Sequence, residues 1–265
     1  MNFSEVAEKP GSPEWNRVRD QVKEALVEHG CFEATFDGVP MDSRKLLQGS
    51  MNELFELPLE TNMRNFSEKP YHGYAGQYTM FPLYERIGIE NADIYDEVDN
   101  LSKTFWPEGH PGFSKTIQSF SERLLALDQI IRKMILESLG LEKYMVEHIS
   151  STYYLLRINK YKGPQTDDGK VGVAKHTDKS MLTILYQNEV EGLEVETKGG
   201  DLDSLEARTR FFHCHERDSL HAGHLIKAPD ELVDDEHPLL FKPFDHCEFM
   251  RFLYLNEDED YQQFA

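Results

Sequence analysis

Apolar side chains recur at helical spacing in three stretches within the first 140 residues. The first stretch begins at Ser12-Pro13 and ends at Gly30, residues that favour the start and the end of a helix. The second runs from Pro40 to Pro58. The third, from Pro111 to Gly140, is the longest and keeps its apolar residues on one face. The pattern predicts a mainly helical N-terminal part.

From Ser151 onward the hydrophobic period changes to the alternation that is typical of β-strands. Residues 153–161 alternate until Gly163-Pro164, residues 181–186 alternate again, and 192–195 begin another short strand. No helical pattern separates these strands, which favours an antiparallel jelly roll over a parallel sheet. We therefore predict an α+β fold in which N-terminal helices (residues 1–148) pack on a C-terminal double-stranded β-helix, or jelly roll (residues 149–265).

Two stretches of the N-terminal part have no clear period. The first dozen residues are polar and are expected to be loosely held. Residues 65–89 are rich in aromatic residues and glycine, and we expect a long irregular loop there. Such loops are uncommon in compact domains unless they bind something, so this one either borders a ligand site or packs on the helices.

Composition and charge narrow the classes of partner. The formal net charge is -20, and the acidic residues are spread along all 265 residues. This disfavours nucleic acids and anionic membrane surfaces, which need a basic face. Three distant cysteines imply no disulfide framework, and no apolar run is long enough to span a membrane. We expect a cytoplasmic protein whose partner is a small molecule; the sequence indicates no oligomeric state.

His176 and Asp178 are the first candidate for chemistry. They stand two residues apart, directly before the alternating run 181–186. In an extended chain these side chains point to the same face, so the imidazole and the carboxylate could converge. Such a pair supplies two ligands of the 2-His-1-carboxylate iron site. A solvated turn at a strand edge is the alternative interpretation.

The neighbouring sequence carries a family resemblance. STYYLLRINKYKGPQ (residues 151–165) and VGVAKHTDKSMLTILYQNEVEGLEV (residues 171–195) resemble the plant iron(II)- and 2-oxoglutarate-dependent dioxygenases. The residues of these two segments are similar to those of the family's glucosinolate-type branch, which produces alkenyl and hydroxyalkyl compounds. The resemblance implies Fe(II) bound by His176 and Asp178, and 2-oxoglutarate as cosubstrate contacted by Asn159 and Tyr161. It also implies oxidation of a small organic metabolite, with succinate and carbon dioxide as coproducts.

The chain departs from the family's pattern between residues 200 and 223. A His-Arg-Val segment with the second iron histidine, and an Arg-x-Ser pair for 2-oxoglutarate, have no counterpart here. Residues 202–217 are charged and alternate poorly, so no buried strand is expected there. We therefore expect an incomplete jelly roll that binds metal and cosubstrate weakly or not at all. The alternative function is that of an inactive or splice-variant relative, at most a scaffold or binding protein.

Four histidines could replace the missing iron ligand: His213, His215, His221 and His224. The sequence His213-Cys214-His215 also resembles part of a zinc site, but no second Cys or His pair completes it. The sequence does not choose among the four histidines.

Overall fold

The computed structural model describes residues 1–6, 9–69, 71–79, 81–163, 172–173, 175–176, 178, 180–188, 190, 192–196, 198–200, 202–204, 211–215, 225–239, 242–245, 248–249 and 252. Of residues 203–204, 211–215 and 225 only the backbone is described. In these ranges no helix is both long and apolar enough to cross a membrane.

The predicted helices are present with the predicted ends. Ser12 accepts a hydrogen bond from the backbone N–H of Trp15 at 3.1 Å, and Gly30 ends the first helix with φ 71°. Because that conformation is left-handed, it favours glycine. The helices are α1 (Pro13–His29), α2 (Met41–Glu56), α3 (Leu59–Asn62), α4 (Tyr95–Phe105), α5 (Pro111–Ser138) and α6 (Met145–Ser151), with 3-10 turns η1 (Glu142–Tyr144) and η2 (Asp230–Leu232).

All paired strands of the described chain run antiparallel, as the alternation predicts. They form sheets in the orders β1-β8-β5, β2-β3-β4, β6-β7 and β10-β9. The α+β prediction is therefore confirmed. The strands are β1 (Cys31–Ala34), β2 (Gly73–Gly76), β3 (Tyr84–Glu90), β4 (Leu155–Tyr161), β5 (Leu182–Tyr186), β6 (Glu194–Glu196), β7 (Leu202–Ser204), β8 (Phe211–His215), β9 (Leu225–Ile226) and β10 (Phe244–Asp245).

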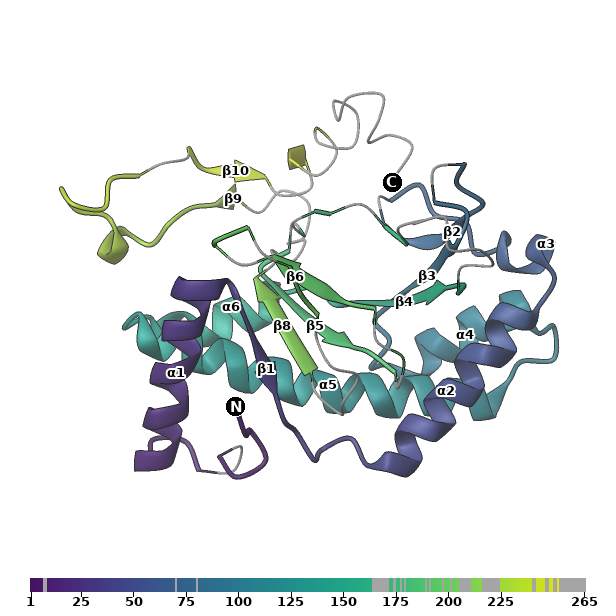
Figure 1. Ribbon diagram of the computed structural model, residues 1–265, viewed down its shortest axis with the longest axis horizontal. Coiled ribbons are helices and arrows are strands. Elements are labelled where there is room, and N and C mark those ends of the chain that lie inside the picture. Colours follow the sequence, from purple (N-terminus) through teal and green to yellow (C-terminus); the bar gives the residue numbers. More distant parts are fainter. Residues whose placement is uncertain are drawn as a thin grey trace.

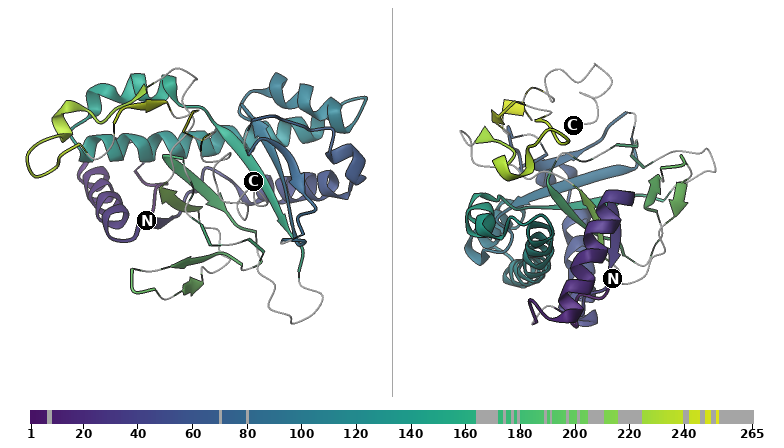
Figure 2. Two further views of the ribbon diagram at one scale, coloured as in Figure 1. Left: turned by 90° about the horizontal axis from the view of Figure 1, so that it is seen from above. Right: turned by 90° about the vertical axis from the view of Figure 1, so that its left-hand side faces the viewer.

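Helix α5 is the central element of the helical layer. It contacts α1, α2 and α4 along its length and runs beneath the strands in Figure 1. Ile117, Leu127 and Ile131 are fully buried in one core cluster that also includes Ile87 of β3 and Ile158 of β4. The two further views show the helices on one side of the strands (Figure 2). One continuous apolar core therefore joins the helices to the sheets.

Two expectations for the N-terminal part are wrong. Residues 65–89 are not one irregular loop, because they contain β2 and β3. The first residues are not loose either: Phe3 and Val6 are fully buried, and Asn2 forms a parallel bridge with Thr35. In both places a short segment gains its order from hydrogen bonds to a distant strand, which a local hydrophobic pattern does not report.

Residues 202–217, where no buried strand is expected, do form strands. They contribute β7 and β8, and β8 lies between β1 and β5. A central strand completes the backbone hydrogen bonds of both neighbours, and this gain depends on backbone groups rather than on a clean side-chain pattern. The remaining residues near the predicted gap, 205–210 and 216–224, lie outside the described residues.

The domain division at residues 148 and 149 remains a prediction. The β2-β3-β4 sheet crosses it, since β3 pairs along its length with β4.

A buried polar cluster connects α5 to α6. Arg132 Nε donates to Asp128 Oδ2 at 2.6 Å, and Arg132 Nη1 lies 3.0 Å from His148 Nε2. Burial, with a smaller contribution from the charge of Arg132, lowers the pKa of His148 to about 4. His148 is therefore neutral at pH 7 and accepts a hydrogen bond from Arg132.

This cluster predicts a loss of stability in acid. Because the pKa of His148 is lower in the folded protein than the usual 6.5, protons bind the unfolded chain preferentially. The contribution of neutral His148 is complete above pH 6.5 and is lost as the pH falls toward 4. We expect His148→Gln to be less acid-sensitive than the wild type by on the order of 1–2 kcal/mol, discounted for the exposed part of the ring. Urea unfolding at pH 7 and pH 4.5 measures this, with exposed His237→Gln as control; equal pH dependence in all three proteins would contradict it.

Candidate active site

The two faces of the β3–β4 pair differ: one is polar, and the other carries the apolar residues that reach the core, together with the opposed residues Glu85 and Lys160. Ile87, Ile89 and Ile158 point into the core and are at most 4% exposed. Directly opposed residues of an antiparallel pair share a face, so the intervening positions form a second surface. The register on that surface pairs Tyr84 with Tyr161, Arg86 with Asn159 and Gly88 with Arg157.

The two predicted cosubstrate residues, Asn159 and Tyr161, both lie on this polar face. Tyr84 donates its hydroxyl to Asn159 Oδ1 at 3.1 Å, and the rings of Tyr84 and Tyr161 lie 5.2 Å apart between centroids. With Oδ1 engaged, the amide NH2 of Asn159 is the group available to a ligand. Asn159 and Tyr161 are both exposed, which leaves them accessible.

Protonation of Tyr161 follows from its surroundings. Although the residue is 51% exposed, desolvation by the packed atoms around it raises its pKa, and Tyr84 raises the pKa further. The charge of Arg157 lowers this pKa and that of Asp178 raises it, so both charged groups act on the phenol. The Tyr161 hydroxyl is therefore a hydrogen-bond donor at neutral pH.

The predicted metal ligands lie together at the entrance to β5. His176 Nε2 is 3.1 Å from Asp178 Oδ1, and their side chains are 46% and 22% exposed. The preceding Gly172 packs against Tyr161, since a Cβ at Gly172 would come within 2.7 Å of the Tyr161 ring. The segment that carries His176 and Asp178 thus passes close to Tyr161. The imidazole nitrogen and the carboxylate are accessible and of the donor types that iron(II) takes, so they fit two of its positions.

A third protein ligand is not seen in the described ranges. No group of three or more His, Cys, Asp and Glu side chains that could hold a metal occurs there. His221 and His224 lie outside the described residues. The backbone of β8 places His215 opposite Leu182 and His213 opposite Ile184. His215 is therefore aligned with the first residue of β5, four positions after Asp178.

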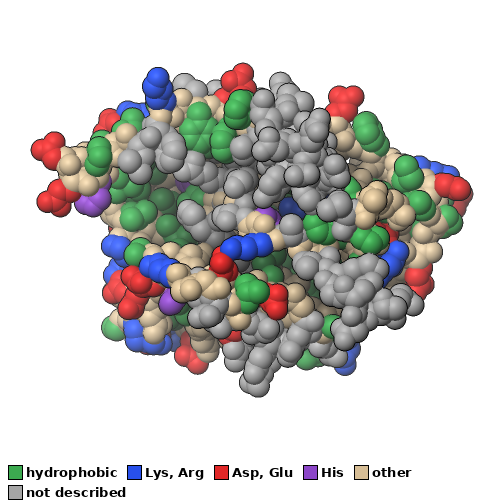
Figure 3. Space-filling model, turned by 45° about the horizontal axis from the view of Figure 1, so that its top comes forward, with side chains coloured by type: hydrophobic (Ala, Val, Ile, Leu, Met, Phe, Trp, Pro, Cys, Tyr) green, Lys and Arg blue, Asp and Glu red, His purple; other side chains and the backbone are tan. Residues whose placement is uncertain are grey.

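Two residues of this face were not among the candidates from sequence. Arg86 and Arg157 lie on the same surface as Asn159 and Tyr161. The available signal was the alternation in β3, where Tyr84 and Arg86 alternate with Ile87 and its apolar neighbours. Glycine at 88 and the charged Glu85 among the apolar positions concealed it. Figure 3 shows basic and histidine side chains near the centre of the face viewed.

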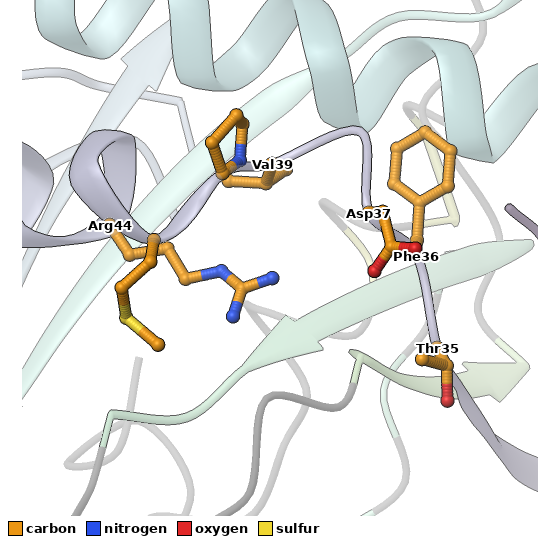
Figure 4. Close-up of a pocket in the computed structure, with 7 residues that line it drawn as sticks. Thr35, Phe36, Asp37, Val39 and Arg44 are labelled. Carbon is orange, nitrogen blue, oxygen red and sulfur yellow. The ribbon is translucent and has the colours of Figure 1, made fainter.

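A separate cavity of about 400 Å³ lies between β1 and α2. Figure 4 shows the side chains of Arg44 and Asp37 directed toward the space between the start of α2 and the loop before it. No residue of β3, β4 or β5 borders this cavity, so it is distinct from the candidate active site. It is lined by Thr35, Phe36, Asp37, Val39, Pro40, Met41 and Arg44.

A His-x-Asp pair before a strand of antiparallel sheets supplies two of the three ligands of the 2-His-1-carboxylate site, which is typical of non-haem iron(II) oxygenases. Family models agree with this class. Residues 152–225 match the 2OG-Fe(II) oxygenase superfamily, and residues 2–105 match the model described as non-haem dioxygenase in morphine synthesis N-terminal.

Similarity to an individual relative supports the same family. The chain is 38% identical over 290 residues to a probable 2-oxoglutarate-dependent dioxygenase, AOP1.2, of Arabidopsis thaliana, covering 95% of this chain and 89% of the relative. The chain belongs to the Fe(II)- and 2-oxoglutarate-dependent dioxygenases, as the resemblance indicated. The family assignment, the cofactors Fe(II) and 2-oxoglutarate, and the dioxygenase function are thereby confirmed, and the inactive alternative is not favoured over them; the weak binding expected of this chain stays a prediction.

Solved structures agree on the fold. A dioxygenase for auxin oxidation from rice is similar with a TM-score of 0.77 at 23% identity, over 97% of this chain and 95% of that one. The corresponding Arabidopsis thaliana protein in complex with 2-oxoglutarate gives a TM-score of 0.77 at 21% identity, over 90% and 98%.

The alignment with AOP1.2 is longer than the part of this chain that it covers. It spans 290 positions, whereas 95% of this 265-residue chain is about 252 residues. About 38 aligned positions therefore have no residue in this chain. This number is consistent with an internal segment that the relative has and this chain lacks.

Proposed function

We propose that His176 and Asp178 are iron(II) ligands of this dioxygenase, and that Asn159 and Tyr161 bind 2-oxoglutarate during oxidation of a small organic molecule. The observation that carries the proposal is the His176–Asp178 pair, 3.1 Å between Nε2 and Oδ1, beside Tyr161. A cytoplasmic location and the lack of nucleic-acid partners are part of the proposal; the first is supported by three distant cysteines that imply no disulfide framework, and the second by the net charge of -20.

The chain's own residues would act mainly by holding groups in place. Arg157 Nη2 donates to the Tyr84 hydroxyl at 3.4 Å, and that hydroxyl donates to Asn159. This relay orients the Asn159 amide so that its NH2 group, with the Tyr161 hydroxyl, can donate to a carboxylate. Iron(II), when bound, supplies the oxidative decarboxylation of 2-oxoglutarate by dioxygen. His176 must bind it as neutral imidazole, so metal affinity should rise with pH through the range in which a histidine loses its proton.

We further propose His215 as the third protein ligand. Its support is the pairing of β8 with β5, which aligns His215 with Leu182. A third protein ligand is needed because the two residues before β5 hold only two of the three positions of the 2-His-1-carboxylate site.

Anaerobic titration of the metal-free protein with iron(II), followed by calorimetry, tests the ligand set. We expect one site per chain, weakened by about 100-fold or more in His176→Ala and in His215→Ala. His237→Ala is the matched control, since His237 is exposed and pairs with Asp234. Equal affinity in His176→Ala and wild type would exclude His176 as a ligand. An unchanged His215→Ala variant would exclude His215 alone and leave His176 and Asp178 standing.

A further inference from the structure

Arg86 and Arg157 lie on the polar face of the β3–β4 pair. Arg86 is 4% exposed and Arg157 is half-buried. In the part of the chain that the structure describes, neither guanidinium forms an ion pair with an Asp or Glu. The chain has 48 acidic residues against 28 Lys and Arg. Carboxylates are therefore abundant, and composition does not explain why these two cations have none.

Uncharged groups make the contacts of both arginines. Arg86 Nη1 donates to the backbone carbonyl of Tyr71, and Arg86 also hydrogen-bonds the side chain of Tyr78. Arg157 Nη2 donates to the Tyr84 hydroxyl, whereas Arg157 Nε is buried without a hydrogen-bond partner. Burying a cation among neutral groups costs free energy, because they do not replace its hydration or its counter-ion. An arrangement of this kind is expected where a ligand supplies the missing negative charge.

The two guanidinium groups converge on one aromatic ring. Their central carbons lie 5.7 Å (Arg86) and 5.4 Å (Arg157) from the centroid of the Tyr71 ring. Burial lowers the pKa of Arg86, and the positive charge of Arg157 lowers it further. Two like charges are therefore held close together in a poorly solvated place. An anion between them would relieve this repulsion.

The backbone of Tyr71 is itself unusual. Its φ of 65° lies in the left-handed region, which is costly for a residue with a side chain, by roughly 1 kcal/mol or more. This conformation holds the Tyr71 ring over the arginines and its carbonyl against Arg86. Strain of this kind persists where the surroundings enforce it, and it is found at ligand sites more than elsewhere.

The carboxylate that shares the face of β3 with Arg86 is already engaged. Glu90 accepts from Lys69 Nζ at 2.9 Å and from the hydroxyl of Tyr153, and His72 Nε2 lies 3.4 Å away. Glu90 is therefore not available to neutralise Arg86. On the other side, Asp178 acts on Tyr161 and pairs with His176. The arginine pair thus lies between Glu90, whose carboxylate already has partners, and the candidate metal ligands.

We propose that Arg86 and Arg157 bind the carboxylate of a small organic acid beside the metal site. Planar guanidinium groups match the two oxygens of a carboxylate. The rings of Tyr71, Tyr78 and Tyr84 lie beside the arginines and can contact the hydrocarbon part of the acid. The acid is either 2-oxoglutarate, whose distal carboxylate otherwise lacks an Arg-x-Ser partner in this chain, or an acidic substrate. The location of the acid beside the iron rests on the proposed function, whereas the binding of the acid by the two arginines does not.

Calorimetry on the metal-free full-length chain, with excess chelator, tests the proposal without turnover. The probes are 2-oxoglutarate, phenylacetate and neutral phenylacetamide. We expect at least one of the two acids to bind, phenylacetamide not to bind, and Arg157→Gln to weaken the acid about tenfold or more. Lys160→Gln is the matched control, since it removes a cation from the opposite face of the same strand. Arg86→Lys keeps the charge at the buried position but loses the planar fork, so it should weaken binding while still folding.

Each outcome either identifies which acid the arginines bind or contradicts the proposal. Binding of 2-oxoglutarate alone assigns the pair to the cosubstrate, binding of phenylacetate alone assigns it to an acidic substrate, and competition between them assigns one shared carboxylate position. Binding of neither acid, equal binding of the amide, or equal losses in Arg157→Gln and Lys160→Gln would overturn it. Iron affinity measured in parallel should be unchanged in Arg157→Gln, so failure of the metal site and failure of the arginine pair are told apart.

Discussion

Alanine in place of Asp178 should reduce iron-dependent conversion of 2-oxoglutarate to succinate by at least about 100-fold. The carboxylate supplies the only negative charge in the predicted ligand set. Even residues that only orient a metal ligand change metal affinity or activity by about 10–100-fold when they are replaced, so loss of a ligand should cost at least as much. Asp178 lies 3.1 Å from His176 and is 22% exposed, so its removal disturbs little packing. Succinate released at saturating iron and 2-oxoglutarate is the measurement.

The matched control for this experiment is Asp234→Ala. Asp234 also pairs with a histidine, His237, but on an exposed segment, and its loss should leave succinate formation unchanged. Conversion by Asp178→Ala at the wild-type rate would exclude Asp178 as a ligand. No conversion by the unmodified chain would instead favour the inactive relative. Insertion of a segment with His-Arg-Val and Arg-x-Ser near residue 222 should then restore succinate formation.

Asp128→Ala should destabilise the fold by about 3–5 kcal/mol, the largest effect on stability that we expect. The Asp128 carboxylate accepts from Arg132 Nε at 2.6 Å, and the side chains are 9% and 1% exposed. Removing Asp128 leaves the buried Arg132 guanidinium without this carboxylate. Replacing both, with Asp128→Leu and Arg132→Met, should recover most of the loss because no buried charge remains. Urea unfolding with an unchanged m-value measures both variants.

The exposed pair Glu14–Arg17 provides the comparison. It has the same signs of charge on α1, with side chains 44% and 56% exposed, and Glu14→Ala should not change the unfolding midpoint measurably. A double variant of Asp128 and Arg132 as unstable as Asp128→Ala would contradict the explanation by an unpaired charge. Packing around Arg132 would then be the dominant contribution.

Local pattern predicted much of the helical part and the strands that carry the first candidates. Serine and proline at the start of α1 and glycine at its end act within one turn of backbone, so the sequence alone locates these ends. The alternation of β4 and β5 likewise needs no distant partner to be recognised. Residues two positions apart in an extended chain point to the same face, and His176 and Asp178 do lie 3.1 Å apart. Their proximity was therefore predictable.

Only the tertiary structure decided what surrounds that pair. The pairing of β3 with β4 places Arg86 opposite Asn159, and these residues are 73 positions apart in the sequence. The insertion of β8 between β1 and β5 brings His215 beside the start of β5. Neither neighbour is visible in a short window, because a register is selected by hydrogen bonds and burial summed over the whole sheet. The sequence by itself determined the three longest helices, the candidate iron-binding motif and the family. Long-range strand pairing alone brought to the candidate active site two arginines that have no acidic partner within the described ranges.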